Sequence, residues 1–172
     1  MKILDATSGF RVFLKNRVPR DLVCVDIRAS VKPDIVADDR FLPFRNDVFG
    51  AVYFDPPHKH GYGGFHKERY SGFGSYNNMR ALFLRLFLRG SREFTRVLAD
   101  NGIFVTKLTK VTQFQGDGSN SRHHYSILEA QMDSRFVEYA QAAGLRLVAR
   151  NERSSEGMSR TARVVWLTFK KS

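Results

Sequence analysis

The chain alternates short apolar runs with segments that have helical periodicity or are rich in turn-forming residues. The apolar runs contain many β-branched and aromatic residues, which is typical of buried strands. This alternation favours parallel strands joined by crossover connections, and therefore an α/β fold. We predict about seven strands, at residues 2–5, 22–27, 34–37, 51–55, 102–109, 145–151 and 163–170.

Two segments have the three- and four-residue apolar spacing of an amphipathic helix. The longer one spans about residues 79–100, and the Asn101-Gly102 pair that follows it is a stop signal. The second spans about residues 126–143 and is followed by Gly144. The connections between the first four strands are short, so we expect only small helices or turns there. Residues 152–157 are rich in turn formers and predict an antiparallel hairpin between the last two strands.

The composition indicates a globular domain with a phosphate-rich partner. A length of 172 residues suits one domain, 1–172, and the hydrophobic fraction of 42% is ordinary. No apolar run approaches the roughly 20 residues needed to cross a bilayer, and no signal-peptide pattern is present, so we expect a cytoplasmic protein. The net charge of +11 favours a polyanionic partner over a membrane surface. The single cysteine, Cys24, lies in an apolar run and is expected in the core rather than as a nucleophile.

Acidic residues stand at the ends of four predicted strands. Asp5 ends the first strand, Asp26 ends the second, Asp38 and Asp39 follow the third, and Asp55 ends the fourth at a pair of prolines. Because the carboxyl ends of parallel strands meet at one edge of a sheet, these carboxylates are expected to gather there. A carboxylate after the second strand is suited to accept ribose hydroxyls. Magnesium binding is the rival interpretation, which the positive net charge and the absence of a P-loop weaken.

Several motifs, taken in order, resemble those of the class I methyltransferases that use S-adenosylmethionine. The sequence ILDATSGF, residues 3–10, is similar to the first motif of that family, and VCVDIR, residues 23–28, is similar to the second. The sequence ADDRFLPFRNDVFGAVYFDPPH, residues 37–58, resembles the third and fourth motifs. The resemblance implies a Rossmann-like sheet of seven mostly parallel strands with an antiparallel last strand, in a single minimal domain.

The resemblance also implies which residues would hold S-adenosylmethionine. Six residues are assigned in this way: Asp5, Ala6 and Gly9 around the methionine part, Asp26 at the ribose, and Asp38 with the backbone near Arg40 at the adenine. The chain departs from the family pattern Gly-x-Gly, because Arg11 stands where the second glycine is usual.

The sequence DPPH, residues 55–58, resembles the Asp-Pro-Pro-Tyr signature of methyltransferases that act on an exocyclic amine of a base. The resemblance implies that Asp55 and the carbonyl of Pro56 accept the two N–H bonds of the amine. This would localise the amine lone pair and aim it at the sulfonium methyl, which is orientational and electrostatic catalysis. Pro57 would stiffen the turn, and His58 would stack on the base.

Two simpler interpretations of this stretch are kept as alternatives. Asp-Pro-Pro can be a plain turn that ends a strand. His58, His60 and His66, or the adjacent pair His123-His124, could bind zinc. Nothing else in the sequence completes a convincing ligand set, and methyl transfer requires no metal, so we expect no metal site.

Two segments rich in Gly, Ser and Asn, residues 58–78 and 110–124, follow predicted strands and are expected to border one site. In the first, cations alternate with aromatic residues, a composition suited to phosphate contact and base stacking. The candidate substrate-binding residues there are His60, Tyr62, Phe65, Lys67, Arg69 and Tyr70. Arg85 and Arg89 are added because they begin a stripe of arginines, continued by Arg92 and Arg96, along the long predicted helix. A connector loop and a solvated helix face are the alternative explanations.

These observations predict an S-adenosylmethionine-dependent methyltransferase that modifies an exocyclic amine of a base in structured RNA, with cytidine N4 in ribosomal RNA as the preferred target. RNA is favoured over DNA because the chain has no room for a separate target-recognition domain, and an unpaired base enters a pocket at low cost. Adenine N6, guanine N2, a DNA amino-methyltransferase and a non-catalytic RNA-binding module are the alternatives.

Overall fold

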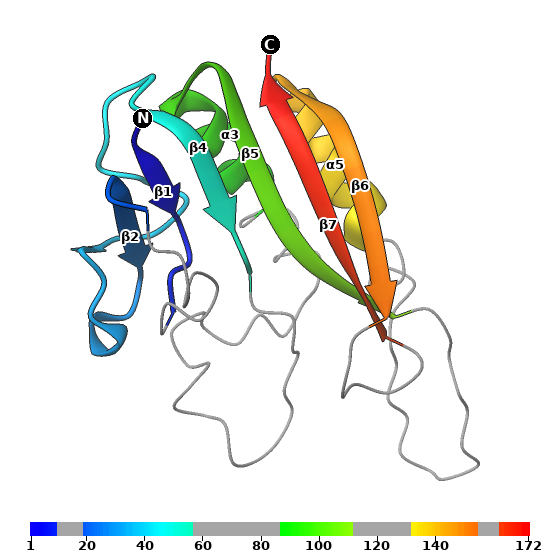
Figure 1. The fold of residues 1–172 in the computed structure, drawn as a ribbon, viewed down its shortest axis with the longest axis horizontal. Coiled ribbons are helices and arrows are strands. Elements are labelled where there is room, and N and C mark those ends of the chain that lie inside the picture. Colours follow the sequence, from blue (N-terminus) through cyan, green and yellow to red (C-terminus); the bar gives the residue numbers. More distant parts are fainter. Residues whose placement is uncertain (10–18, 57–86, 112–131, 155–161) are drawn as a thin grey trace, which may run out of the picture.

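The computed structural model describes residues 1–9, 19–56, 87–111, 132–154 and 162–172. Seven strands form one sheet in the order β3-β2-β1-β4-β5-β7-β6. The strands are β1 Ile3–Asp5, β2 Leu22–Asp26, β3 Ile35–Val36, β4 Phe49–Phe54, β5 Leu98–Val111, β6 Leu145–Ser154 and β7 Ala162–Lys171. Strand β7 is antiparallel to both of its neighbours, and the other pairs are parallel (Figure 1). The predicted α/β class and the antiparallel last strand are confirmed.

Two helices, α3 (Arg89–Val97) and α5 (Met132–Ala142), lie on the same side of the sheet (Figure 1). An aromatic cluster fills the space between these helices and the strands. Phe94 of α3 lies 4.8 Å from Phe54 and 5.1 Å from Phe104, measured between ring centroids. Phe136 of α5 stacks on Phe104, and both rings are fully buried. This packing fixes β4 and β5 side by side against α3.

Side chains of β5 alternate between the two faces of the sheet, as the pleat requires. Phe104, Thr106 and Leu108 are fully buried beneath the helices. Ile103 and Lys107 point to the opposite face, where Ile103 is exposed and Lys107 is partly exposed. Lys107 therefore belongs to the face that α3 and α5 do not cover.

The long helix was predicted to continue to residue 100, and this is wrong. Helix α3 ends at Val97, and Leu98 is already extended and pairs with Phe49 of β4. Leu98 is fully buried, so pairing and burial in the sheet override the apolar periodicity that continues through it. Asn101 has a left-handed φ of 61° and lies within β5, so the Asn-Gly pair does not cap the helix. The predicted residues 79–86 lie outside the described residues.

The second helix ends where the sequence predicts. Helix α5 stops at Ala142, and Gly144 has a φ of 93° that suits a glycine past a helix end. The pairing of β6 with β7 is antiparallel as expected, although residues 155–161 between them lie outside the described residues. Strand β5 extends to Val111, so the loop expected from residue 110 begins later than predicted.

Three further expectations concern connections, the cysteine and membrane segments. Between β1 and β4, the helical element in the described part of the chain is the short 3-10 turn η2, Ala29–Val31, in line with the expected small helices. Cys24 is buried in β2, which confirms it as a core residue. No helix within the described residues is long and apolar enough to span a membrane.

Candidate functional site

The sheet changes its direction of growth between β1 and β4. From β1 the chain adds β2 and β3 on one side, and then returns to place β4 and β5 on the other. In open α/β sheets, ligands bind outside the carboxyl ends of the strands at such a switch point. The site is therefore expected at the edge where β1 and β4 end.

The loop after β1 is held between its two neighbouring strands. The Ala6 N–H donates to the Tyr53 carbonyl of β4 at 2.9 Å, and the Ser8 N–H donates to the Val25 carbonyl of β2 at 2.9 Å. Asp5 and Ala6 are both buried in this position. The backbone that follows β1 thus spans the edge from β4 to β2.

Asp26 ends β2 directly beside this loop. The Gly9 N–H donates to Asp26 Oδ2 at 2.9 Å, and Gly9 has a positive φ of 49°. Arg28 covers the carboxylate: its backbone N–H and Nε donate to Oδ1 at 2.9 and 3.0 Å, and Nη2 donates to Oδ2 at 3.2 Å. Asp26 is only 2% exposed as a result. Ribose hydroxyls that bind this carboxylate would have to displace the guanidinium of Arg28.

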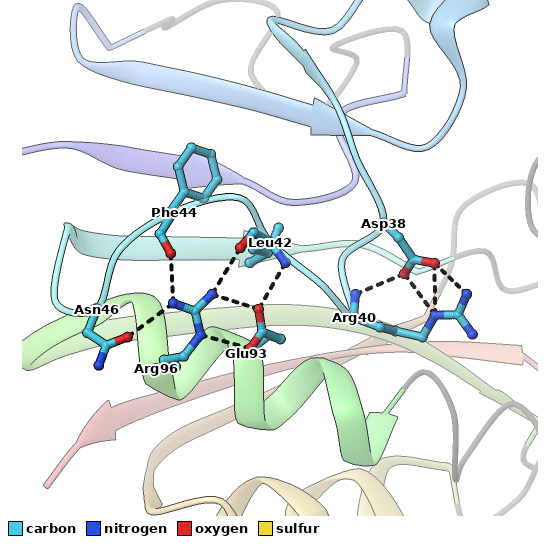
Figure 2. A network of polar contacts seen from close by, with 7 residues as sticks. All are labelled: Asp38, Arg40, Leu42, Phe44, Asn46, Glu93 and Arg96. Atoms are coloured by element: carbon cyan, nitrogen blue, oxygen red, sulfur yellow. Dashed lines mark hydrogen bonds and ion pairs between the residues drawn. The ribbon is translucent and has the colours of Figure 1, made fainter.

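Asp38 is held by an arginine two residues further on, in the same way. The backbone N–H of Arg40 donates to Asp38 Oδ1 at 2.9 Å, and the guanidinium contacts both carboxylate oxygens (Figure 2). This guanidinium lowers the pKa of Asp38 below its ordinary value. Burial, reinforced by a hydrogen bond to Asp38, raises the pKa of Asp39 well above its ordinary value. Two neighbouring carboxyl groups at this edge therefore have pKa values that are shifted in opposite directions.

The loop that connects β3 to β4 is attached to α3 by Glu93 and Arg96 (Figure 2). Glu93 Oε2 accepts the Leu42 N–H at 2.9 Å, and Arg96 donates to the carbonyls of Leu42 and Phe44 at 3.0 and 2.7 Å. The two side chains also pair with each other at 2.7 Å. The Arg96 guanidinium lowers the pKa of Glu93, and the carboxylate raises the pKa of Arg96. Arg96 belongs to the predicted arginine stripe, but it holds the loop that contains Asp38 rather than lying on a solvated face.

Asp55 lies at the switch point. Its backbone N–H donates to Thr7 Oγ1, in the loop after β1, at 2.8 Å. Its carboxylate Oδ2 lies 3.2 Å from Nζ of Lys107, on the neighbouring strand β5. Pro56 follows directly and is buried. Asp55 is thus connected both to the β1 loop and to β5.

Thr7 and Lys107 were not among the residues predicted for the site. The signal for Lys107 is its position in the register, because Phe54 pairs with Thr106 in the parallel β4–β5 ladder. The residues that follow this pair, Asp55 and Lys107, are consequently neighbours. No local pattern around residue 107 contains this information.

Most of the predicted substrate-binding residues lie outside the described residues. These are His60, Tyr62, Phe65, Lys67, Arg69, Tyr70 and Arg85. The same holds for Pro57 and His58 of the predicted catalytic motif and for Arg11. Arg89 is exposed at the first position of α3. Because α3 ends where β5 begins, its first residue lies toward the edge at which β4 ends.

Comparison with known proteins identifies the fold. No protein-family model and no curated protein sequence matches the chain. Among solved structures, a Listeria monocytogenes protein inferred to be an S-adenosylmethionine-dependent methyltransferase superposes with a TM-score of 0.65 and 8% identity, over 99% of this chain and 91% of that one. The chain has the fold of the class I methyltransferases.

Two further structures show how widely this methyltransferase fold is used. The geranyl diphosphate C-methyltransferase from Streptomyces coelicolor A3(2), solved with S-adenosyl-L-homocysteine, has a TM-score of 0.60 and 12% identity, over 99% of this chain and 71% of that one. The [4+2]-cyclase SpnF has a TM-score of 0.62 and 13% identity, over 99% of this chain and 74% of that one. At such identities the methyltransferase fold is shared, and the reaction must be argued from the site.

Proposed function

We propose that this protein is an S-adenosylmethionine-dependent methyltransferase that modifies an exocyclic amine of a base in structured RNA. The proposal rests chiefly on the position of Asp55 at the switch point, one hydrogen bond of 2.8 Å from Thr7 in the loop after β1. In this fold a ligand binds where these two strands end. An acid that ends β4 is thereby adjacent to the loop assigned to the cofactor.

The placement of the strand-end residues fits S-adenosylmethionine. The Gly9 N–H donates to the buried carboxylate of Asp26, so the loop after β1 and the end of β2 lie together where a nucleoside would bind, and the ribose hydroxyls would replace the Arg28 guanidinium there. Asp38, whose pKa is lowered by the guanidinium of Arg40, is fixed by that residue at the next position along the same edge. When bound, the cofactor would supply a methyl group on a positively charged sulfur.

The role of the chain's own residues is to orient the amine. An exocyclic amine is a poor nucleophile because its lone pair is delocalised into the ring. Asp55 and the carbonyl of Pro56 would accept its N–H bonds and direct the lone pair out of the ring plane. The amine loses one proton when the new N–C bond forms, and a carboxylate in contact with it can accept that proton.

The choice of a nucleic acid as the substrate rests on charge. The chain has a net charge of +11, and Arg89, Arg92, Arg153 and Arg163 are exposed in the described part of the chain. Cations on a small domain bind phosphates, and the affinity of such contacts falls steeply as the salt concentration rises. Cytidine N4 in ribosomal RNA is our preferred target within this class.

The proposal is tested by methyl transfer to RNA. Incubation of the protein with labelled S-adenosylmethionine and total RNA should label RNA that is sensitive to ribonuclease. Asp55→Ala should reduce the rate by about 10²- to 10³-fold, in the range found when one stabilising hydrogen-bonding group is removed from an active site. Asp21→Ala is the matched control, because Asp21 is 61% exposed before β2 and pairs only with the amino terminus among the contacts described.

The outcome also separates the alternatives. Mass spectrometry of the labelled nucleoside identifies the base and the atom. Label that enters only DNA would reject the RNA assignment, and equal activity of the Asp55 and Asp21 variants would reject the role of Asp55.

A second candidate, a non-catalytic RNA-binding module, is favoured by one observation. Arg28 already occupies the carboxylate of Asp26 that a ribose would need. Calorimetric titration distinguishes the two functions: the methyltransferase binds S-adenosylmethionine, whereas the module binds RNA tightly and shows no heat with the cofactor.

A further inference from the structure

The pairing of β4 with β5 places a carboxylate and an ammonium side by side at the switch point. Asp55 follows Phe54 and Lys107 follows Thr106, and Phe54 and Thr106 are paired in the parallel ladder. Lys107 Nζ lies 3.2 Å from Asp55 Oδ2. The Asp55 side chain is 28% exposed and the Lys107 side chain is 27% exposed, so both are partly open to a ligand at this edge, while Asp55 Oδ1 is buried.

We propose that Lys107 is a specificity-determining residue that reads the ring nitrogen next to the target amine. This inference rests on the proposed function. In cytosine, adenine and guanine, the carbon that bears the exocyclic amine is also bonded to a ring nitrogen with an in-plane lone pair. The amine is a donor and the ring nitrogen is an acceptor, so this edge of the base complements a carboxylate next to an ammonium.

The chemistry of lysine allows both contacts at once. An ammonium group has three donors and no acceptor. One N–H can remain on Asp55 while a second donates to the ring nitrogen of the base. A hydrogen bond from a charged donor is about twice as strong as a neutral one, so its loss should be measurable. Uracil and hypoxanthine have no such amine edge and are excluded by the same pair.

The expected effect falls on binding rather than on the rate of the bound complex. A cation at the ring nitrogen draws the amine lone pair into the ring, so Lys107 does not make the amine more nucleophilic. Its hydrogen bond is already formed in the bound substrate and is no stronger in the transition state, and binding of this kind lowers KM without raising kcat. Lys107→Met should therefore raise KM and leave kcat nearly unchanged.

The test removes the ring nitrogen from the substrate and compares the effect with removal of the ammonium from the protein. The probe is the RNA fragment that receives the label from S-adenosylmethionine, synthesised with the natural nucleoside or with the deaza analogue in which CH replaces the ring nitrogen next to the amine. With the wild-type protein, the analogue should lower kcat/KM by about 10- to 100-fold, mainly through KM. Lys107→Met should lose a similar factor on the natural fragment and show no further loss on the analogue.

Two variants serve as controls for folding and charge. Lys170→Met removes a cation from the same face of neighbouring strand β7 and should leave KM unchanged. Lys107→Arg retains a charged donor and should recover part of the affinity. Should Lys107→Met fail to fold, the wild-type protein alone decides, because an unchanged KM on the analogue overturns the inference.

Failure of this inference differs from failure of the proposed function. If the wild-type protein methylates the RNA but the analogue penalty is the same with and without Lys107, then Lys107 does not read the ring nitrogen and the proposed function stands. If the wild-type protein transfers no methyl group to RNA, both proposals fall together.

Discussion

Replacement of Arg96 by methionine tests whether the contact between α3 and the β3–β4 loop stabilises the fold. The guanidinium donates to three oxygens of that loop, which are the carbonyls of Leu42 and Phe44 and Oδ1 of Asn46. It also pairs with Glu93, which accepts the Leu42 N–H. Arg96→Met keeps much of the aliphatic stem and removes all of these donors.

The magnitude follows from the number and the exposure of these contacts. A hydrogen bond that involves a charged group contributes about 1.5–3 kcal/mol when buried. The Arg96 side chain is 31% exposed, so water replaces part of what is lost, and contacts of a single group are not additive. We expect the free energy of unfolding to fall by about 2–4 kcal/mol, less than the sum of three buried bonds.

Urea unfolding followed by circular dichroism measures this change. With a slope of about 1–3 kcal/mol per molar urea, the midpoint should fall by about 1 M or more. Arg92→Met is the matched control, because Arg92 is exposed on the same helix and should change stability by no more than about 0.5 kcal/mol. The reasoning is refuted if the two variants unfold at the same urea concentration.

The pH dependence provides an independent check of the same contact. The Arg96 guanidinium holds the pKa of Glu93 below its ordinary value of 4.5. A lowered pKa in the folded state contributes stability above the unfolded-state pKa, and this contribution is lost as the pH falls through the folded-state pKa. The stability difference between wild type and Arg96→Met should therefore be complete at neutral pH and shrink below about pH 4.5. A difference that stays constant across this range would exclude the role of the ion pair.

Two further substitutions test other parts of the fold. Gly102→Ala should destabilise the protein by about 1–3 kcal/mol, since the new Cβ would lie 2.7 Å from the backbone oxygen of Ala99. At Gly50, the three atoms nearest to an added Cβ all belong to the flexible side chain of Met1, so the control Gly50→Ala should lower Tm less, and equal shifts in Tm would contradict this account. Asp39→Asn should become increasingly stabilising as the pH rises above 3.8. The pKa of Asp39 is raised in the folded state, so the wild-type protein loses stability as the pH rises through that pKa, whereas asparagine does not titrate. Unfolding at several pH values measures this, and a pH-independent difference would refute it.

Local patterns in the sequence were sufficient for the order and type of the elements. Apolar runs bounded by proline, glycine and acidic residues located all seven strands, because strand formation and strand termination depend on neighbouring residues. The gathering of Asp5, Asp26 and Asp55 at one edge followed from the rule that parallel strands end together. The stop at Gly144 was equally local, since it depends on the backbone freedom of one residue.

Only the tertiary structure decided which charged groups meet when they are far apart in the sequence. Lys107 contacts Asp55 through the β4–β5 register, and Arg96 reaches the carbonyl of Leu42 across 54 residues of sequence. Leu98 joined the sheet instead of the helix because its pairing with β4 and its complete burial outweigh the local periodicity. Such contacts depend on how distant segments pack and align, and a one-residue change of register would move every side chain to the other face. The sequence by itself therefore determined where the acids stand and placed an arginine two residues after Asp26 and after Asp38, whereas packing and register brought Lys107 to Asp55.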